Sequence, residues 1–430
     1  MGDEERQVLF TEIRPPFWRS KSNVGDELEN VRTCLRWMCV DQSNPWRASL
    51  SWSLFFLLAI LVPILSHFGL TCAECDGKLH RPYDAVVQLS LTILATVSFL
   101  CLSEFVRKYG LRKFLNFDKL CRENDKVRQG YTAQLDRSLK LLALFVLPCF
   151  AAEVAYKIWW YSSGASKIPF LGNVYVSDVL ACILELCSWL YRTSIFFFVC
   201  ILFRLICYLQ ILRLQNFAIV FQEESDVESV LKEHLRIRNH LRVISHRFRS
   251  FLLCSLFIVT ASQLMSLLNT TRPNADVSIY RAGELALCSM TLMAGLIILI
   301  RSATKITHKA QSITCLAAKW HVCATIDSFD ITDCETPTTS CDKLFPTEES
   351  EEDDDAGYEE DDIDTTKIMM PIYAHSICFQ KRQALVTYFE NNRAGITVFG
   401  YMIDRSCLQI MFMIELSLVL WFLGRTIGFS

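Results

Sequence analysis

The feature that most constrains this chain is a set of apolar stretches about 20 residues long. Ala48–Leu70 contains 23 residues without a Lys, Arg, Asp or Glu. As a helix rising 1.5 Å per residue, it exceeds the roughly 30 Å hydrocarbon thickness of a bilayer. Ala85–Ser103 and Ser250–Asn269 have the same character. These stretches predict membrane-spanning helices.

Four further stretches reach bilayer length but are shorter or carry charge. They are Leu141–Tyr161 with Glu153 and Lys157, Val179–Phe203 with Glu185 and Arg192, Leu285–Ile300, and Cys407–Gly424 with Glu415. Charged side chains are tolerated inside a membrane where they face the interior of a helix bundle. The predicted fold is therefore all-α, a polytopic membrane protein with seven transmembrane helices.

Composition supports long helices and excludes several other classes. The 430 residues are 52% hydrophobic, with only 15 Gly and 11 Pro, as suits uninterrupted helices. The basic residues are dispersed rather than gathered in a basic domain, so nucleic-acid binding has no support. Residues 1–47 carry fifteen acidic and basic side chains and no leading apolar core, so no signal peptide is predicted.

Lys and Arg are distributed unevenly between the two sides of the predicted spans. Segments 1–47, 104–140, 204–249 and 301–405 contain 7, 10, 8 and 10 of them, and the intervening loops contain few. The positive-inside rule then places the N-terminus in the cytoplasm and the C-terminus outside. This orientation is the inverse of a G-protein-coupled receptor.

The chain divides into four predicted regions. Residues 1–47 form a cytoplasmic segment whose apolar face, Val31, Cys34, Leu35 and Met38, indicates an interfacial helix. Residues 48–326 form a six-helix bundle with long cytoplasmic helical extensions. Residues 327–368, with twelve acidic side chains between Glu348 and Asp364, form a disordered acidic loop. Residues 369–430 form a cytoplasmic helix followed by the seventh span.

One amphipathic stripe lies in the third cytoplasmic segment. Its apolar-face residues are spaced alternately four and three apart: Val230, His234, Ile237, Leu241 and Ile244. This spacing is typical of one helix face, which we assign to an extension of the fourth helix. The stripe packs either on other cytoplasmic helices of the chain or on a neighbouring subunit.

Charged and aromatic side chains coincide on the third and fourth spans. Glu153 and Lys157 are four residues apart and share a helix face, and Glu185 and Arg192 are seven apart. With Trp160 and Trp189 they form a candidate ligand pocket with charged anchors and aromatic walls. The alternative is structural ion pairing beside an interfacial aromatic belt.

Other site chemistry is sparse. Cys72 and Cys75, in a predicted outer loop, are either a short-loop disulfide or free thiols. The histidines show no metal-ligand spacing, and no cofactor or metal site is predicted. The sequence has no phosphate-binding glycine loop and no nucleophile elbow, so an enzyme is not expected.

Two motifs carry a family resemblance. Leu35-Arg36-Trp37-Met38-Cys39-Val40-Asp41 and Pro45-Trp46-Arg47 resemble the plant gustatory receptor-like family, a plant domain of unknown function, over about Pro15 to Phe429. Through its inverted layout and Gly400…Ile403-Asp404, the chain is distantly similar to insect gustatory and odorant receptors. Where those receptors end with a Thr-Tyr pair and a Gln-Phe pair, this chain has Leu416-Ser417 through Ile427-Gly428-Phe429.

The resemblance implies a chemoreceptor-like, ligand-gated cation channel in the plasma membrane or an endomembrane. It would be a homotetramer that binds membrane lipids, a small-molecule ligand and permeant cations. Its seventh helix would line the pore, with Asp404, Met411, Glu415 and Leu418 as candidate pore residues. Glu415 either forms an acidic ring around that pore or pairs within one bundle. Two functions outside this class stay open: a transporter of a small solute, and a membrane scaffold without a pore.

Overall fold

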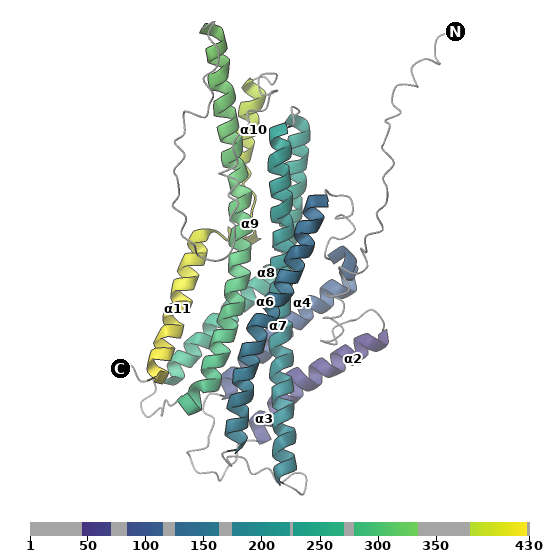
Figure 1. Ribbon diagram of the computed structural model, residues 1–430, viewed down its shortest axis with the longest axis vertical. Helices are drawn as coiled ribbons and strands as arrows, with labels where there is room; N and C mark the ends of the chain where they lie inside the picture. Colours follow the sequence, from purple (N-terminus) through teal and green to yellow (C-terminus); the bar gives the residue numbers. More distant parts are fainter. Residues whose placement is uncertain are drawn as a thin grey trace, which may run out of the picture.

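The computed structural model describes residues 45–69, 84–114, 125–162, 174–223, 227–270, 279–333 and 379–427. Within these ranges the fold is helical apart from one hairpin, whose two strands have two residues each (Figure 1). The proposed Cys72–Cys75 pair, the apolar face at residues 31–38 and the acidic run at 348–364 lie outside the described residues.

The helices of the bundle are long and follow one another closely in the sequence. They are α2 (Pro45–Phe55), η1 (Phe56–Leu61), α3 (Val62–Gly69), α4 (Asp84–Phe114), α6 (Asp125–Ser162), α7 (Val174–Glu223), α8 (Val227–Thr270) and α9 (Ile279–Asp333). A shorter C-terminal set follows: α10 (Phe379–Asn391), strands β1 (Thr397–Val398) and β2 (Tyr401–Met402), and α11 (Arg405–Ile427). α9 thus continues seven residues into the segment predicted to be a disordered loop.

Six helical segments are long and apolar enough to cross a membrane, by length and composition. They are Pro45–Phe68, Ala85–Glu104, Ala143–Ser162, Tyr175–Ala218, Val227–Leu268 and Gly283–Val322. Each contains or largely overlaps one of the first six predicted spans. α11, with 23 residues, covers the seventh predicted stretch. An integral membrane protein follows from these helices.

Several helices are far longer than a bilayer is thick. α7, α8 and α9 have 50, 44 and 55 residues, so at 1.5 Å per residue each exceeds roughly 30 Å by a factor of about two or more. Because consecutive helices run in opposite directions, their polar extensions gather at one end of the molecule, the upper end in Figure 1.

The amphipathic stripe from Val230 to Ile244 belongs to α8, not to the helix of the fourth span as predicted. The fourth-span helix α7 ends at Glu223, and α8 runs without interruption from Val227 through the fifth span. The error arose because both arrangements give the same periodicity, and no Gly or Pro separates the stripe from Ser250. The five apolar-face residues of the stripe are all buried.

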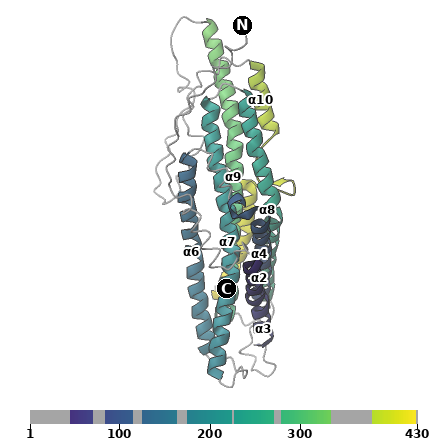
Figure 2. The same cartoon turned by 90° about the vertical axis from the view of Figure 1, so that its right-hand side faces the viewer.

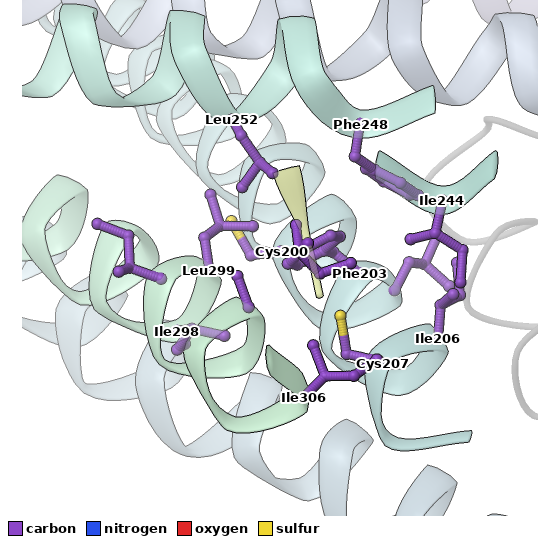
Figure 3. Packing of buried hydrophobic residues seen from close by; sticks show 14 of the residues in the cluster. Cys200, Phe203, Ile206, Cys207, Ile244, Phe248, Leu252, Ile298, Leu299 and Ile306 are labelled. Carbon is purple, nitrogen blue, oxygen red and sulfur yellow. The ribbon is translucent and has the colours of Figure 1, made fainter. Parts of the chain in front are cut away.

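α7 occupies the centre of the bundle, and most of its apolar stretch is buried. It packs against α4, α6, α8 and α9, and Figure 2 shows α6 along one edge of this assembly. Figure 3 shows part of the core, where Cys200 and Phe203 of α7 meet Leu252 of α8 and Leu299 of α9.

Gly295 allows α9 to approach α7 closely. A Cβ atom at this position would overlap the ring of Phe196, so a side chain here requires a shift of its neighbour. A larger residue there would therefore separate the two longest helices of the bundle.

α10 closes the polar end by packing on α8 and α9. His234 lies between rings, with its centroid 4.5 Å from Phe389 and 5.7 Å from Tyr388. It sits sixteen residues before the apolar stretch that begins at Ser250, beyond the membrane-spanning part of α8. Burial, with the nearby Arg238 guanidinium, lowers the pKa of His234 to about 4. Arg238 Nη1 also donates to Asn392 Oδ1 at 2.7 Å, at the end of α10.

Candidate functional site

Lys157 of α6 stands at the centre of a buried charge cluster. Its Nζ lies 2.9 Å from Glu185 Oε2 on α7, 3.0 Å from Glu284 Oε1 on α9 and 3.8 Å from Glu153 Oε1 on its own helix. The four side chains are between 0% and 6% exposed as whole residues. A buried charge is stable only when it is paired, so these contacts tie three helices together at one point.

Arg192 forms a second part of the cluster, one to two turns further along α7. Its Nε donates to Ser188 O at 3.3 Å. Its Nη1 donates to two acceptors on α4, Gln88 O at 3.4 Å and Thr92 Oγ1 at 3.2 Å. Arg192 is 3% exposed as a whole residue, and its guanidinium links α7 to α4.

The first span is attached to the same place by two serine hydroxyls. Ser66 Oγ of α3 donates to Glu185 Oε1, and Ser188 Oγ donates to Leu58 O at 2.6 Å. Leu58 lies in the π-helical turn η1, and the wider π turn is frequent at functional positions in helices. The cluster therefore joins parts of all the first four spans and the sixth.

The structure brings together five of the six residues predicted for the ligand pocket. Glu153, Lys157, Glu185, Trp189 and Arg192 line one small cavity. Trp160 does not line it; its ring stacks edge-on against Tyr161 at 5.0 Å. Tyr161 follows Trp160 directly in α6, and neither ring lines the cavity.

Sequence reasoning missed Glu284, which lines the cavity and is bound to Lys157. Glu284 immediately precedes the apolar stretch Leu285–Ile300, where a carboxylate ordinarily marks the end of a span. Its nearly complete burial depends on packing against α6. No pattern in the sequence alone carries that information.

Little room is left between these side chains, enough for about one water molecule. A small organic ligand would therefore have to displace side chains on entering. In the part of the chain that the structure describes, no group of three or more His, Cys, Asp or Glu residues is arranged to hold a metal ion.

A hairpin precedes α11 and is fixed to two long helices. Ile396 N donates to Thr307 Oγ1 of α9, and Thr397 N donates to Ser245 Oγ of α8, both at 3.1 Å. Thr397 pairs with Met402, and Gly400 at the turn has a φ of +93°, a conformation that glycine adopts without strain.

α11 begins directly after this hairpin. Asp404 Oδ1 accepts a hydrogen bond from Arg405 N, and Leu408 N donates to Asp404 O at 3.1 Å, so Asp404 starts the helix. Of the predicted pore residues, Asp404 is exposed at the base of α11. Met411 is partly buried and packs against the core of its own chain. The side chains of Glu415 and Leu418 lie outside the described part of the chain.

Comparison with known proteins gives a family. A family model described as a protein of unknown function, DUF3537, matches residues 26–414. The chain belongs to this family. No curated protein matches the sequence.

The fold of this DUF3537 protein is similar to solved structures of insect receptors. The olfactory receptor OR5 from Machilis hrabei matches with a TM-score of 0.54 at 12% identity, covering 92% of this chain and 98% of that receptor. The same receptor in complex with eugenol matches with a TM-score of 0.53 at 11% identity, covering 93% of this chain and 99% of that one. At this identity the likeness establishes an olfactory receptor-like fold.

Proposed function

We propose that this protein is a chemoreceptor-like, ligand-gated cation channel that assembles as a homotetramer with α11 lining the pore. The observation that carries the proposal is the likeness to an insect olfactory receptor along nearly the whole of both chains. Because one of those structures contains eugenol, a small organic molecule is the ligand class proposed for this chain. We further propose that the family is the plant gustatory receptor-like one.

The buried charge cluster is the proposed place of ligand action. It joins α6, α7 and α9 through Lys157, and a ligand that enters there must loosen at least one of these ion pairs. Low-dielectric surroundings make each pair strong and its loss expensive, so occupancy would change the relative positions of the three helices. Charged anchors and the Trp189 ring are suitable for a ligand with an aromatic body and a polar group.

α9 provides the connection from this cluster to α11. Glu284 binds Lys157 near one end of the span, and Thr307, 23 residues further along the same helix, accepts the Ile396 N–H of the hairpin. α11 starts at Arg405, immediately after that hairpin. A displacement of α9 at Glu284 would therefore reach the base of α11 through one rigid helix and one hydrogen-bonded hairpin.

The outer surface of α11 requires a partner in this account. Ile410, Met413 and Leu420 are between 57% and 66% exposed in the single chain. Their spacings of three and seven place them on one helix face, away from Met411. In a tetramer this face would be covered by neighbouring copies of the chain, so we propose it as part of the contact between subunits.

The proposed orientation has the N-terminus and the polar helix extensions in the cytoplasm. It is supported by the excess of Lys and Arg in the segments at that end. The plasma membrane is the proposed location.

Planar-bilayer recording of the purified protein tests this proposal. Eugenol and a panel of small organic molecules would be presented on the side of the charge cluster. Cation-selective unitary currents that depend on one of these molecules are expected. A verified assembly that shows no unitary currents with any of these molecules would contradict the proposal.

A transporter is the second candidate, favoured by the buried ionisable cluster itself. Buried carboxylates near a lysine are a common feature of proton-coupled pathways across membranes. Proteoliposome uptake that saturates with solute, requires Glu153 or Glu185 and occurs without unitary currents would support this reading over a channel.

A further inference from the structure

Basic side chains from two helices meet where α9 leaves its apolar stretch. Arg301, Lys305 and His308 are spaced four and three apart on α9 and therefore share one face. Arg405, the first residue of α11, reaches this face, with its Nη2 3.4 Å from His308 Nδ1. Arg301 and Arg405 are exposed, and Lys305 and His308 are partly so. We call these four residues the basic face.

The basic face lies at the level of the membrane boundary. Arg301 directly follows the apolar stretch Leu285–Ile300, and Arg405 lies two residues before Cys407, where the last apolar stretch begins. Two helices of opposite direction thus change from apolar to charged at a shared level. Phosphate groups of lipids occupy this level in a bilayer.

Exposed aromatic residues mark the same boundary on the hairpin. Phe399, in the turn between β1 and β2, is 56% exposed, and Tyr401, the first residue of β2, is 83% exposed. Arg249, which directly precedes the apolar stretch of α8, lies 5.2 Å from the Phe399 ring centroid. Exposed aromatic rings beside basic residues are typical of the lipid headgroup region. They give a second indication of the membrane level, independent of the charges on α9.

We propose that the basic face binds the phosphate-bearing headgroup of an anionic lipid. Among the described residues, Arg301, Lys305 and Arg405 provide three positive charges at this face, and Asp404 provides one negative charge at its edge. This excess of positive charge favours a headgroup with more than one negative charge, such as a phosphorylated inositol. Arginine forms paired hydrogen bonds with phosphate, which suits the two exposed guanidinium groups at this position.

A bound headgroup would bridge α9 and the start of α11. Lys305 and His308 flank Thr307, the residue that holds the hairpin through Ile396 N. The lipid would therefore fix the base of α11 relative to α9. This regulatory consequence rests on the proposed channel function, whereas lipid binding itself does not.

The test compares binding in nanodiscs that contain the full-length protein. One set has phosphatidylcholine alone, and the others add phosphatidylserine or a phosphatidylinositol bisphosphate. Native mass spectrometry counts the retained lipids, and a fluorescent short-chain phosphoinositide gives the affinity. The variant is Arg301→Gln/Lys305→Gln/Arg405→Gln. The control is Lys232→Gln/Arg236→Gln/Lys381→Gln, which removes the same charge from exposed positions of α8 and α10.

The proposal predicts that the basic-face variant loses at least tenfold in phosphoinositide affinity while the control variant stays within twofold of the unmodified protein. Equal losses in both variants would show general charge attraction and would overturn the site. Equal affinity for a soluble inositol phosphate and for the lipid would overturn the assignment to a membrane headgroup. Circular dichroism and retained detergent stability verify that the variants are folded. These readouts do not require a current, so a failed channel proposal leaves them interpretable.

Discussion

Lys157 and Glu284 form an ion pair of 3.0 Å between α6 and α9, although 127 residues separate them in the chain. Glu185 of α7 contacts the same ammonium at 2.9 Å. One lysine therefore fixes the relative positions of three helices. Removal of one partner is costly because all three side chains are buried.

Replacement of Lys157 is expected to destabilise the protein strongly. Lys157→Met leaves three buried carboxylates without their central cation, a loss of about 3–5 kcal/mol. Scanning fluorimetry in detergent should show a large fall in melting temperature. Lys232→Met, at an exposed position of α8, is the control and should change it little. An unchanged melting temperature for Lys157→Met would contradict the described pairing, and the swap Lys157→Glu/Glu284→Lys should recover part of the loss.

The hairpin before α11 should loosen when its bond to α9 is removed. Thr307→Val deletes the acceptor of the Ile396 N–H and leaves a buried donor unpaired, at a cost of about 1–3 kcal/mol. Hydrogen–deuterium exchange of peptides covering residues 394–404 should accelerate. Thr304→Val is the matched control, because the Thr304 hydroxyl is buried but bonds only to carbonyls of its own helix, Ile300 O and Arg301 O. Equal exchange in the two variants would argue against the anchoring role of Thr307.

His234 should make the polar end of the bundle sensitive to acid. Its folded pKa of about 4 lies below the ordinary 6.5, so the unfolded chain binds a proton first as the pH falls. Stability is complete above pH 6.5 and declines between 6.5 and 4, by roughly 2 kcal/mol at pH 5. His234→Phe, among the rings of Phe217, Tyr388 and Phe389, should flatten the dependence of melting temperature on pH over this interval. If the variant and the unmodified protein lose stability in parallel, another group is responsible.

Much of this fold was predictable because membrane spans depend on local composition. The first six apolar stretches coincide with six helices of sufficient length. Glu153, Lys157 and Glu185 were expected to lie together, either as a ligand pocket or as structural ion pairs. The contacts of Glu284 and Ser66 with this cluster were not predicted. Their partners lie more than 100 residues away, and periodicity carries no information about packing between helices. For the same reason the stripe from Val230 to Ile244 was assigned to the wrong helix. The inward packing of Met411 depends on α11 lying against its own bundle.

Glu415 remains a sequence-based prediction for ion selectivity. If four copies surround a pore, Glu415→Gln removes an acidic ring and should lower the preference for cations over anions. Reversal potentials under a salt gradient measure this preference, with Ser417→Ala as a control on the same helix. Identical reversal potentials in verified open channels would reject the acidic ring.

The particle mass of the purified protein in nanodiscs tests the central claim most directly, because α11 can line a pore only if several copies surround it. The chain has a mass of 49.5 kDa. Mass photometry, corrected for the lipid and scaffold, should give a protein mass about four times that value. A stable particle with the mass of a single chain would contradict the tetrameric channel, since the exposed face of α11 would then contact only lipid.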